Sequence, residues 1–122
     1  MKKILIADDE SSLRMLVNAT LEGEKFQILQ AKNGHEAVLT AQLEKPDLII
    51  MDWMMAGLSG IEALEILRKT ASTTATPIII LTAKNQSADK EKAFGLGANY
   101  FLAKPFSPLE LLNLVDRILR EN

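Results

Sequence analysis

Short apolar segments alternate with helical segments five times along this 122-residue chain, and the alternation restricts the folds open to it. The apolar segments are Lys3–Ala7, Phe26–Ala31, Asp47–Met51, Pro77–Leu81 and Tyr100–Ala103. Between them, apolar residues recur at the spacing of one helix face; in the first helical segment they are Leu13, Leu16, Val17 and Leu21. Strands that alternate with helices in this way are typical of an α/β domain with a parallel sheet.

The polarity of the apolar segments predicts their order in the sheet. Central strands of a parallel sheet are covered on both faces and are therefore continuously apolar. The first, third and fourth segments have this character, whereas Phe26–Ala31 contains two glutamines and Tyr100–Ala103 is short. We therefore predict a flavodoxin-like (βα)5 fold, a doubly wound sandwich around a five-stranded parallel sheet of order 2-1-3-4-5.

Two capping boxes mark helix starts within this pattern. In Ser59-x-x-Glu62 and Ser107-Pro108-x-Glu110, the serine and glutamate side chains can each accept a hydrogen bond from the other residue's backbone N–H. They predict helices that begin just after Ser59 and Ser107.

Length and composition indicate one domain and exclude several functional classes. About 100–200 residues form one domain, so we expect a single core. The 14 Lys and Arg nearly balance the 16 Asp and Glu, which argues against a surface for nucleic acid or anionic membranes. The chain contains no cysteine, which excludes disulfides and thiolate metal sites. No segment approaches the ~20 apolar residues of a membrane span, and the first apolar run is too short for a secretion signal. We therefore expect a soluble, cytoplasmic protein.

Polar residues stand where four of the predicted strands end. They are Asp8 and Asp9, Asp52, Thr82 and Lys104. The carboxyl ends of parallel strands meet at one edge of the sheet, where ligands bind in open α/β folds. Three crowded carboxylates repel each other unless a cation compensates, and an all-oxygen site suits Mg²⁺. Asp52 could then act as a nucleophile that forms an aspartyl phosphate, with Lys104 and Thr82 neutralising and bonding the transferred oxygens.

Five ordered motifs resemble the receiver domains of two-component response regulators over essentially the whole chain. They are Ile4–Glu10, Pro46–Asp52, Gly57-x-x-Gly60, Pro77–Ala83, and Gly97-Ala98 followed by Phe101-x-x-Lys104-Pro105-Phe106. The resemblance implies one receiver domain over residues 1–122, with no output domain, that acts as a regulatory switch and not as a turnover enzyme. Its implied phosphate donor is a sensor histidine kinase or a histidine phosphotransfer protein.

The resemblance also implies a role for each site residue. Asp52 accepts the phosphoryl group, and Mg²⁺ is bound by Asp8, Asp9, Asp52 and the backbone carbonyl of Met54. Lys104 pairs with the phosphoryl group, and the Lys104–Pro105 peptide bond is cis. Thr82 moves toward the phosphoryl group and Phe101 rotates inward, which changes the surface formed by the fourth helix, the fifth strand and the fifth helix.

Met54 and Lys84 stand at positions that flank the attacking water in this family. Because the Met54 side chain cannot hold a water molecule by a hydrogen bond, we predict slow autodephosphorylation. Asn99-Tyr100 stands where receivers of transcription factors often carry paired acids that form dimer salt bridges. We therefore expect a monomer, with dimerisation on phosphorylation as the alternative; the downstream partner cannot be named from the sequence.

Two other functional classes share parts of this pattern. A small Mg²⁺-dependent hydrolase of the haloacid dehalogenase type would also form an aspartyl phosphate, but it needs a second acid two residues after the nucleophile, where this chain has Met54. A flavodoxin-like FMN-binding protein would cradle a phosphate in the loop after the first strand, and Asp8-Asp9-Glu10 would repel it.

Overall fold

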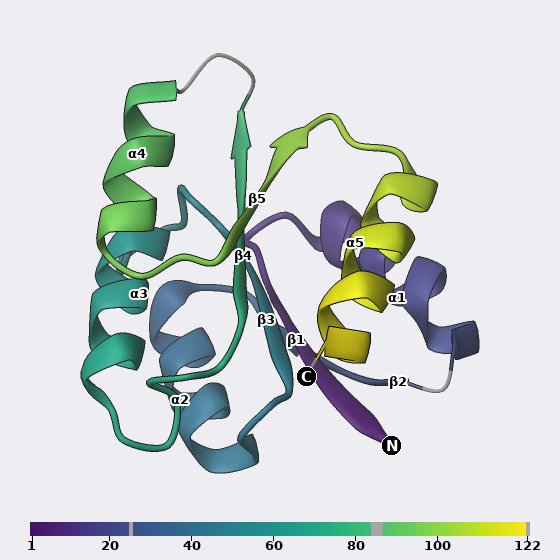
Figure 1. The fold of residues 1–122 in the computed structure, drawn as a ribbon, viewed down its shortest axis with the longest axis horizontal. Helices are drawn as coiled ribbons and strands as arrows, with labels where there is room; N and C mark the ends of the chain where they lie inside the picture. The colour runs from purple at the N-terminus through teal and green to yellow at the C-terminus, as the bar shows by residue number, and fades with distance from the viewer. Residues whose placement is uncertain (25, 84–86, 122) are drawn as a thin grey trace.

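The computed structural model describes residues 1–24, 26–83 and 87–121, and strands alternate with helices throughout this part of the chain. The sheet consists of β1 (Lys2–Ala7), β2 (Phe26–Ala31), β3 (Leu48–Asp52), β4 (Ile78–Ala83) and β5 (Tyr100–Lys104). The helices are α1 (Ser11–Leu21), the 3₁₀ helix η1 (Glu22–Glu24), α2 (Gly34–Glu44), α3 (Gly60–Lys69), α4 (Ser87–Gly95) and α5 (Pro108–Glu121). The strands pair in parallel in the order β2-β1-β3-β4-β5, which confirms the predicted fold (Figure 1).

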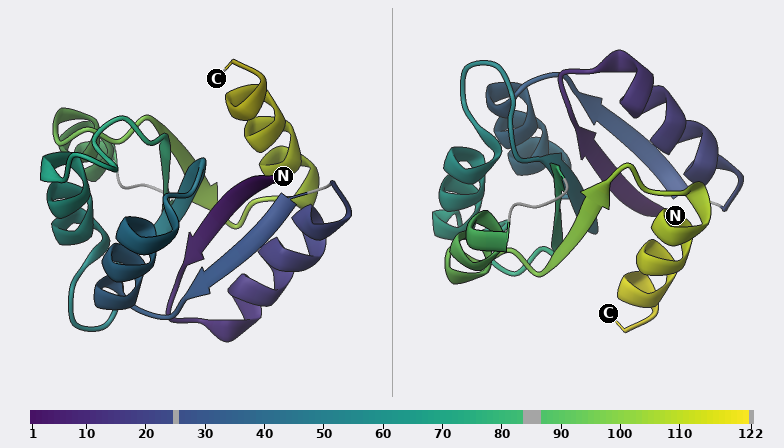
Figure 2. Two further views of the ribbon diagram at one scale, coloured as in Figure 1. Left: turned by 90° about the horizontal axis from the view of Figure 1, so that it is seen from below. Right: turned by 90° about the horizontal axis from the view of Figure 1, so that it is seen from above.

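Helices cover both faces of the sheet, with α1 and α5 on one face and α2, α3 and α4 on the other (Figure 2). Successive side chains of a strand point to opposite faces. In β1, Ile4 and Ile6 belong to the core beneath α1 and α5, whereas Leu5 and Ala7 belong to the core beneath the other three helices. All five residues of β3 are buried, as expected for the central strand.

The predicted capping boxes fix the starts of two helices. The Ser59 hydroxyl accepts from the Glu62 N–H at 3.2 Å while the Glu62 carboxylate accepts from the Ser59 N–H at 3.0 Å. Ser107 and Glu110 make the same reciprocal pair at the start of α5. None of the helices in the described residues combines the length and apolar character that a membrane span requires.

The strands end at polar residues, as the sequence predicts. β3 ends with Asp52 and β5 with Lys104, while β4 continues one residue beyond Thr82 to Ala83. The parallel pairing continues through these polar residues, because Asp52 pairs with Leu81 and Thr82 pairs with Ala103. Backbone pairing in a strand needs no apolar side chain, so each strand extends beyond its apolar run.

Candidate functional site

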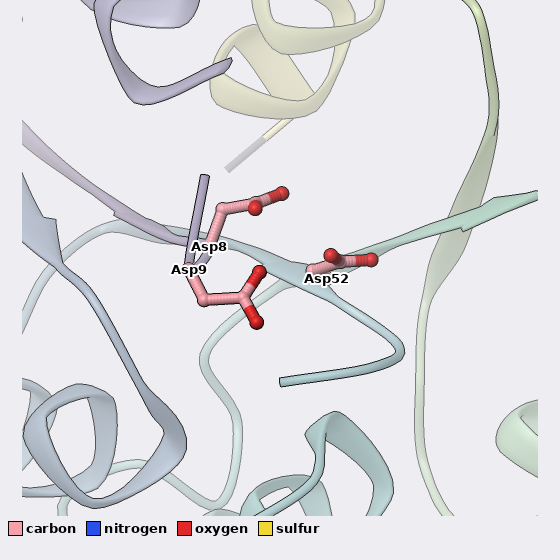
Figure 3. Close-up of side chains that lie close together, drawn as sticks. All are labelled: Asp8, Asp9 and Asp52. Carbon is pink, nitrogen blue, oxygen red and sulfur yellow. The ribbon is translucent and has the colours of Figure 1, made fainter. Parts of the chain in front are cut away.

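Three carboxylates meet at the carboxyl edge of the sheet (Figure 3). Ala7 pairs with Met51 in the ladder between β1 and β3, so the next residues, Asp8 and Asp52, lie side by side. One oxygen each from Asp8, Asp9 and Asp52 lies within 4.8 Å of the others. Asp8 is fully buried, Asp52 is 7% exposed and Asp9 is exposed. The edge therefore gathers negative charge that is largely removed from water.

Lys104, on the edge strand β5, places its ammonium group beside two of these carboxylates. Its Nζ atom lies 3.1 Å from Oδ2 of Asp52 and 3.2 Å from Oδ2 of Asp8. Lys104 stands two residues beyond Leu102 on β5, so both side chains point to the same face, and the long lysine reaches across β4 to β3. The Lys104–Pro105 peptide bond that follows is cis.

Burial and charge set the protonation of this group. Burial and the nearby Asp8 carboxylate raise the pKa of Asp52 from 3.8 to about 6, although the Lys104 ammonium acts in the opposite direction. Burial alone would lower the pKa of Lys104, but the charges and hydrogen bonds of Asp52 and Asp8 outweigh it and leave that pKa above its usual value. At neutral pH the site therefore holds a protonated Lys104 beside an Asp52 carboxyl that is harder to ionise than usual.

Hydrogen bonds hold Asp8 at both its backbone and its side chain. Its N–H donates to the Ala31 carbonyl of β2 at 3.1 Å, and its Oδ1 accepts from the Glu10 N–H at 2.8 Å. Its carbonyl accepts from Nη1 of Arg14 at 2.6 Å. Arg14 was not singled out in the sequence, because it belongs to no motif and its partner is a backbone atom.

The loop after β3 folds back against the strand end. The Trp53 N–H donates to the Leu81 carbonyl at 2.9 Å, and the Gly60 N–H donates to the Trp53 carbonyl at 3.0 Å. A Cβ atom on Gly60 would lie 2.1 Å from the Asp52 carbonyl oxygen, so only glycine fits here. Met54, the second residue after Asp52, leaves 66% of its surface exposed.

Two further predicted residues, Thr82 and Phe101, belong to β4 and β5. Thr82 is 7% exposed near the end of β4, next to the residue that pairs with Asp52. Phe101 of β5 is half-buried, and its ring meets Phe94 of α4 edge-on with centroids 4.7 Å apart. The preceding residue, Tyr100, packs on the opposite face with the Arg117 guanidinium 5.6 Å from its ring centre, as the alternation of strand residues predicts. Lys84 lies outside the described residues.

A groove of about 400 Å³ opens beside Lys104 between α1 and the segment that follows β5. It is lined by Glu10, Leu13, Leu16, Lys104, Pro105 and Phe106. Leu16 is 40% exposed, so the groove offers an apolar surface next to the charged site.

Comparison with known proteins decides the family. Residues 4–116 match the response regulator receiver domain. This chain belongs to that family. The phosphate regulon transcriptional regulatory protein PhoB of Pseudomonas aeruginosa is 40% identical to the receiver domain over 119 residues, which are 98% of this chain and 52% of PhoB. The chain thus spans about half the length of this curated relative.

Solved structures of response regulators and receiver domains have the same fold as this receiver domain. The chemotaxis response regulator CheY4 of Vibrio cholerae superposes with a TM-score of 0.91 at 34% identity, covering 97% of this chain and 98% of that one. The receiver domain of the sensor histidine kinase PA1611 from Pseudomonas aeruginosa has a TM-score of 0.87 at 30% identity, with 95% of each chain covered. That structure has a magnesium ion coordinated in its active-site cleft.

The side chains of this receiver domain fit such an ion. A hard divalent cation prefers oxygen ligands, and the Asp8, Asp9 and Asp52 cluster supplies carboxylate oxygens only. The cluster brings three carboxyl groups together and Lys104 supplies one ammonium to them, which leaves the site suited to a further cation.

Proposed function

We propose that this receiver domain is a phosphorylation-controlled switch in which Asp52 accepts a phosphoryl group in a Mg²⁺-dependent reaction. The donor is the phosphohistidine of a histidine kinase or of a histidine phosphotransfer protein. The observation that carries the proposal is the Lys104 ammonium between Asp8 and Asp52, with Asp9 in the same cluster. Membership of the family implies phosphorylation-dependent signalling, and this geometry supports a role for each residue.

The proposed transfer needs no general base. Because its pKa is about 6, the Asp52 carboxylate is mostly ionised at neutral pH. One of its oxygens forms the new bond to phosphorus as the bond from phosphorus to the donor's imidazole nitrogen breaks, and the electron pair leaves with the imidazole. Lys104 neutralises charge on the transferring oxygens, and the Thr82 hydroxyl would bond them.

The metal would be held by Asp8, Asp9, Asp52 and the Met54 carbonyl. When bound, Mg²⁺ supplies further positive charge beside the phosphoryl oxygens. Oδ1 of Asp8 already accepts from the Glu10 N–H and Oδ2 accepts from Lys104. We therefore propose that Asp8 binds the metal partly through water. Asp9, which is exposed, and Asp52 are the more direct ligands in this proposal.

The proposed output surface is formed by α4, β5 and α5. Phosphorylation would draw Thr82 toward the phosphoryl group and let Phe101 rotate inward, away from its edge-on contact with Phe94. A phosphoryl group adds roughly −1.5 to −2 charges and three strong acceptors, which is enough to bias such a two-state element. Partners would read the rearranged surface.

Several observations support the proposed partners, cellular location and oligomeric state. The apolar groove beside Lys104 gives a protein phosphodonor a surface on which to dock. The net charge of −2 supports signalling without direct nucleic-acid binding, and the lack of cysteine supports a cytoplasmic location. The Asn99 side chain bonds Arg68 at 2.7 Å and the Ile78 N–H at 2.8 Å within its own chain, which supports a monomer.

Acetyl phosphate tests the proposed function directly. With Mg²⁺, the wild-type protein should gain one phosphoryl mass on Asp52 and keep it, whereas Asp52→Asn should gain none. Asp116→Asn, which removes an exposed acid on α5, is the matched control and should label like the wild type. Equal labelling of Asp52→Asn, or steady phosphate release without a labelled protein, would contradict the switch and favour a hydrolase.

A further inference from the structure

Arg14 of α1 reaches back to the strand end that carries the acidic cluster. Its Nη1 atom donates to the Asp8 carbonyl at 2.6 Å, and its Nε donates to Oε1 of Gln30 on β2 at 3.3 Å. The arginine is half-buried between these two partners. Nη1 and Nε of its planar guanidinium are therefore both engaged at the edge of the site.

The position of Arg14 is unfavourable for a helix by itself. Arg14 lies just inside the N-terminal end of α1, where the helix dipole disfavours cations, and the first turn contains no acid to offset it. Glu10, at the N-cap, makes no side-chain capping bond. Local choices that oppose the helix are expected where a residue serves the site.

The Asp8 carbonyl is the group that needs this arginine. β1 ends at Ala7, so the carbonyl of buried Asp8 has passed the end of the strand and requires a donor from elsewhere. Arg14 supplies it. The same peptide unit contains the N–H of Asp9 and is planar, so fixing the Asp8 carbonyl also fixes the direction in which Asp9 leaves the strand.

We propose that Arg14 is a positioning residue for the metal-binding carboxylates, holding the Asp8–Asp9 peptide in the orientation that brings both side chains to Asp52. This inference rests on the proposed function, because it assigns Arg14 to the same Mg²⁺ site. Arg14 touches neither the metal nor the phosphoryl group and acts through the backbone of Asp8.

An electrostatic role and a positioning role of Arg14 predict opposite changes in Mg²⁺ affinity when Arg14 is replaced. A cation close to a metal site repels the metal, so removing its charge alone would strengthen Mg²⁺ binding. Removing a group that orients the ligands weakens binding, typically by 10-fold or more. Arg14→Lys keeps the charge and loses the planar fork, whereas Arg14→Met loses both.

The experiment measures Mg²⁺ affinity by the fluorescence of Trp53, which follows Asp52 in the chain, together with urea unfolding and amide exchange of the metal-free protein. We expect Arg14→Lys and Arg14→Met each to raise the Kd for Mg²⁺ by about 10-fold. Exchange of the Glu10 amide, which donates to Asp8, should be faster in both variants without metal. Arg120→Met, which removes an exposed arginine paired with Asp116, is the control and should leave both quantities unchanged.

Each alternative result has a distinct meaning. Tighter binding by Arg14→Met with no change in Arg14→Lys would assign Arg14 a purely electrostatic effect and overturn the proposal. A lower unfolding free energy with unchanged Kd would also overturn it, because Arg14 would then be only structural. Where the Arg14 variants do not fold, Gln30→Met removes one anchor of the guanidinium and should weaken Mg²⁺ binding in the same direction. Wild-type protein that binds no Mg²⁺ and takes no label would instead contradict the proposed function.

Discussion

The ammonium of Lys104 is shared between Asp52, at 3.1 Å, and Asp8, at 3.2 Å. One carboxylate at the end of β3 and one just after β1 therefore depend on a cation carried by β5, a strand that pairs with neither β1 nor β3. Removing the Lys104 ammonium therefore changes the pKa of Asp52 and takes a partner from the buried Asp8 carboxylate.

Lys104→Met should slow phosphorylation of Asp52 and destabilise the protein. Without the ammonium, the pKa of Asp52 rises above about 6, and a larger fraction is protonated at neutral pH. The buried Asp8 carboxylate also loses a partner, which costs about 2–4 kcal/mol. We expect labelling by acetyl phosphate to fall about 100-fold or more, because the charge that stabilises the transferring oxygens is lost.

Lys3→Met is the matched control for this change. Lys3 also forms a lysine–carboxylate pair, with Glu44 at 3.1 Å, but at the opposite end of β1. Its replacement should cost less than about 1 kcal/mol and leave the labelling rate intact. Equal rates for wild type and Lys104→Met would exclude Lys104 from the transfer.

Asp52→Asn should stabilise the metal-free protein at neutral pH. A carboxyl whose pKa rises from 3.8 in the unfolded chain to about 6 in the fold is harder to ionise when folded. Its contribution to stability therefore falls as pH rises from about 4 to 6, and the cost of a few kcal/mol is complete at pH 7. Urea unfolding at a series of pH values should show the advantage of Asp52→Asn growing across that window and vanishing near pH 4.

Added Mg²⁺ should reverse the order of stability of the wild type and Asp52→Asn. A ligand that binds only the folded state stabilises it by RT ln(1 + [L]/Kd), and the wild type retains all three carboxylates. The wild type should therefore gain more unfolding free energy from Mg²⁺ than the variant. An unchanged difference between the two proteins with and without metal would argue against Asp52 as a ligand.

The sequence predicts the sheet and the acidic edge because both follow from periodic rules. Apolar runs define the strands, and Asp8 and Asp52 share an edge because each stands at the carboxyl end of a central strand. The Arg14 bond to the Asp8 carbonyl follows no such rule, since a side chain that reaches a backbone atom leaves no pattern in the sequence. The same is true of Arg68, whose guanidinium bonds the Gly97 carbonyl at 2.8 Å and Asn99 at 2.7 Å across 29 and 31 residues.

Gly60→Ala should displace the strand end that carries Asp52. The added Cβ would lie 2.1 Å from the Asp52 carbonyl oxygen and 3.0 Å from that of Trp53, so the backbone must shift. We expect a loss of about 1–3 kcal/mol in unfolding free energy and slower labelling of Asp52. Gly95→Ala, where nothing lies within 4 Å of the added Cβ, should do neither. Similar behaviour of the two variants in unfolding and labelling would show that the tight contact at Gly60 has no consequence.

Phe94→Ala should favour the activated state. Phe94 meets Phe101 edge-on, with centroids 4.7 Å apart at 71°, and in the proposed switch this contact would hold Phe101 in its unphosphorylated position. Such aromatic pairs contribute about 0.5–1.5 kcal/mol beyond burial, so their loss should raise the affinity for beryllofluoride about 2- to 10-fold. Trp53 fluorescence measures this affinity. Leu43→Ala, at an exposed position of α2, is the control, and an affinity for Phe94→Ala equal to that of the control would show that the contact between Phe94 and Phe101 does not affect the switch.

Met54 should give the phosphorylated protein a long lifetime. Its side chain is 66% exposed in the turn after Asp52 and offers no good hydrogen-bonding group for an attacking water molecule. We expect the labelled wild type to persist for minutes or longer at room temperature, followed by intact-protein mass spectrometry after the phosphodonor is removed. Met54→Asn introduces an amide that can hold that water and should shorten the half-life several-fold.

Met15→Asn separates this effect from a general change in polarity. Met15 is exposed to the same degree, at 67%, but lies on α1, away from the turn. Because its side chain does not flank Asp52, the half-life of this variant should equal that of the wild type. Loss of the wild-type label within seconds would mean that the water is held by groups other than the Met54 side chain, and that the identity of residue 54 does not limit hydrolysis.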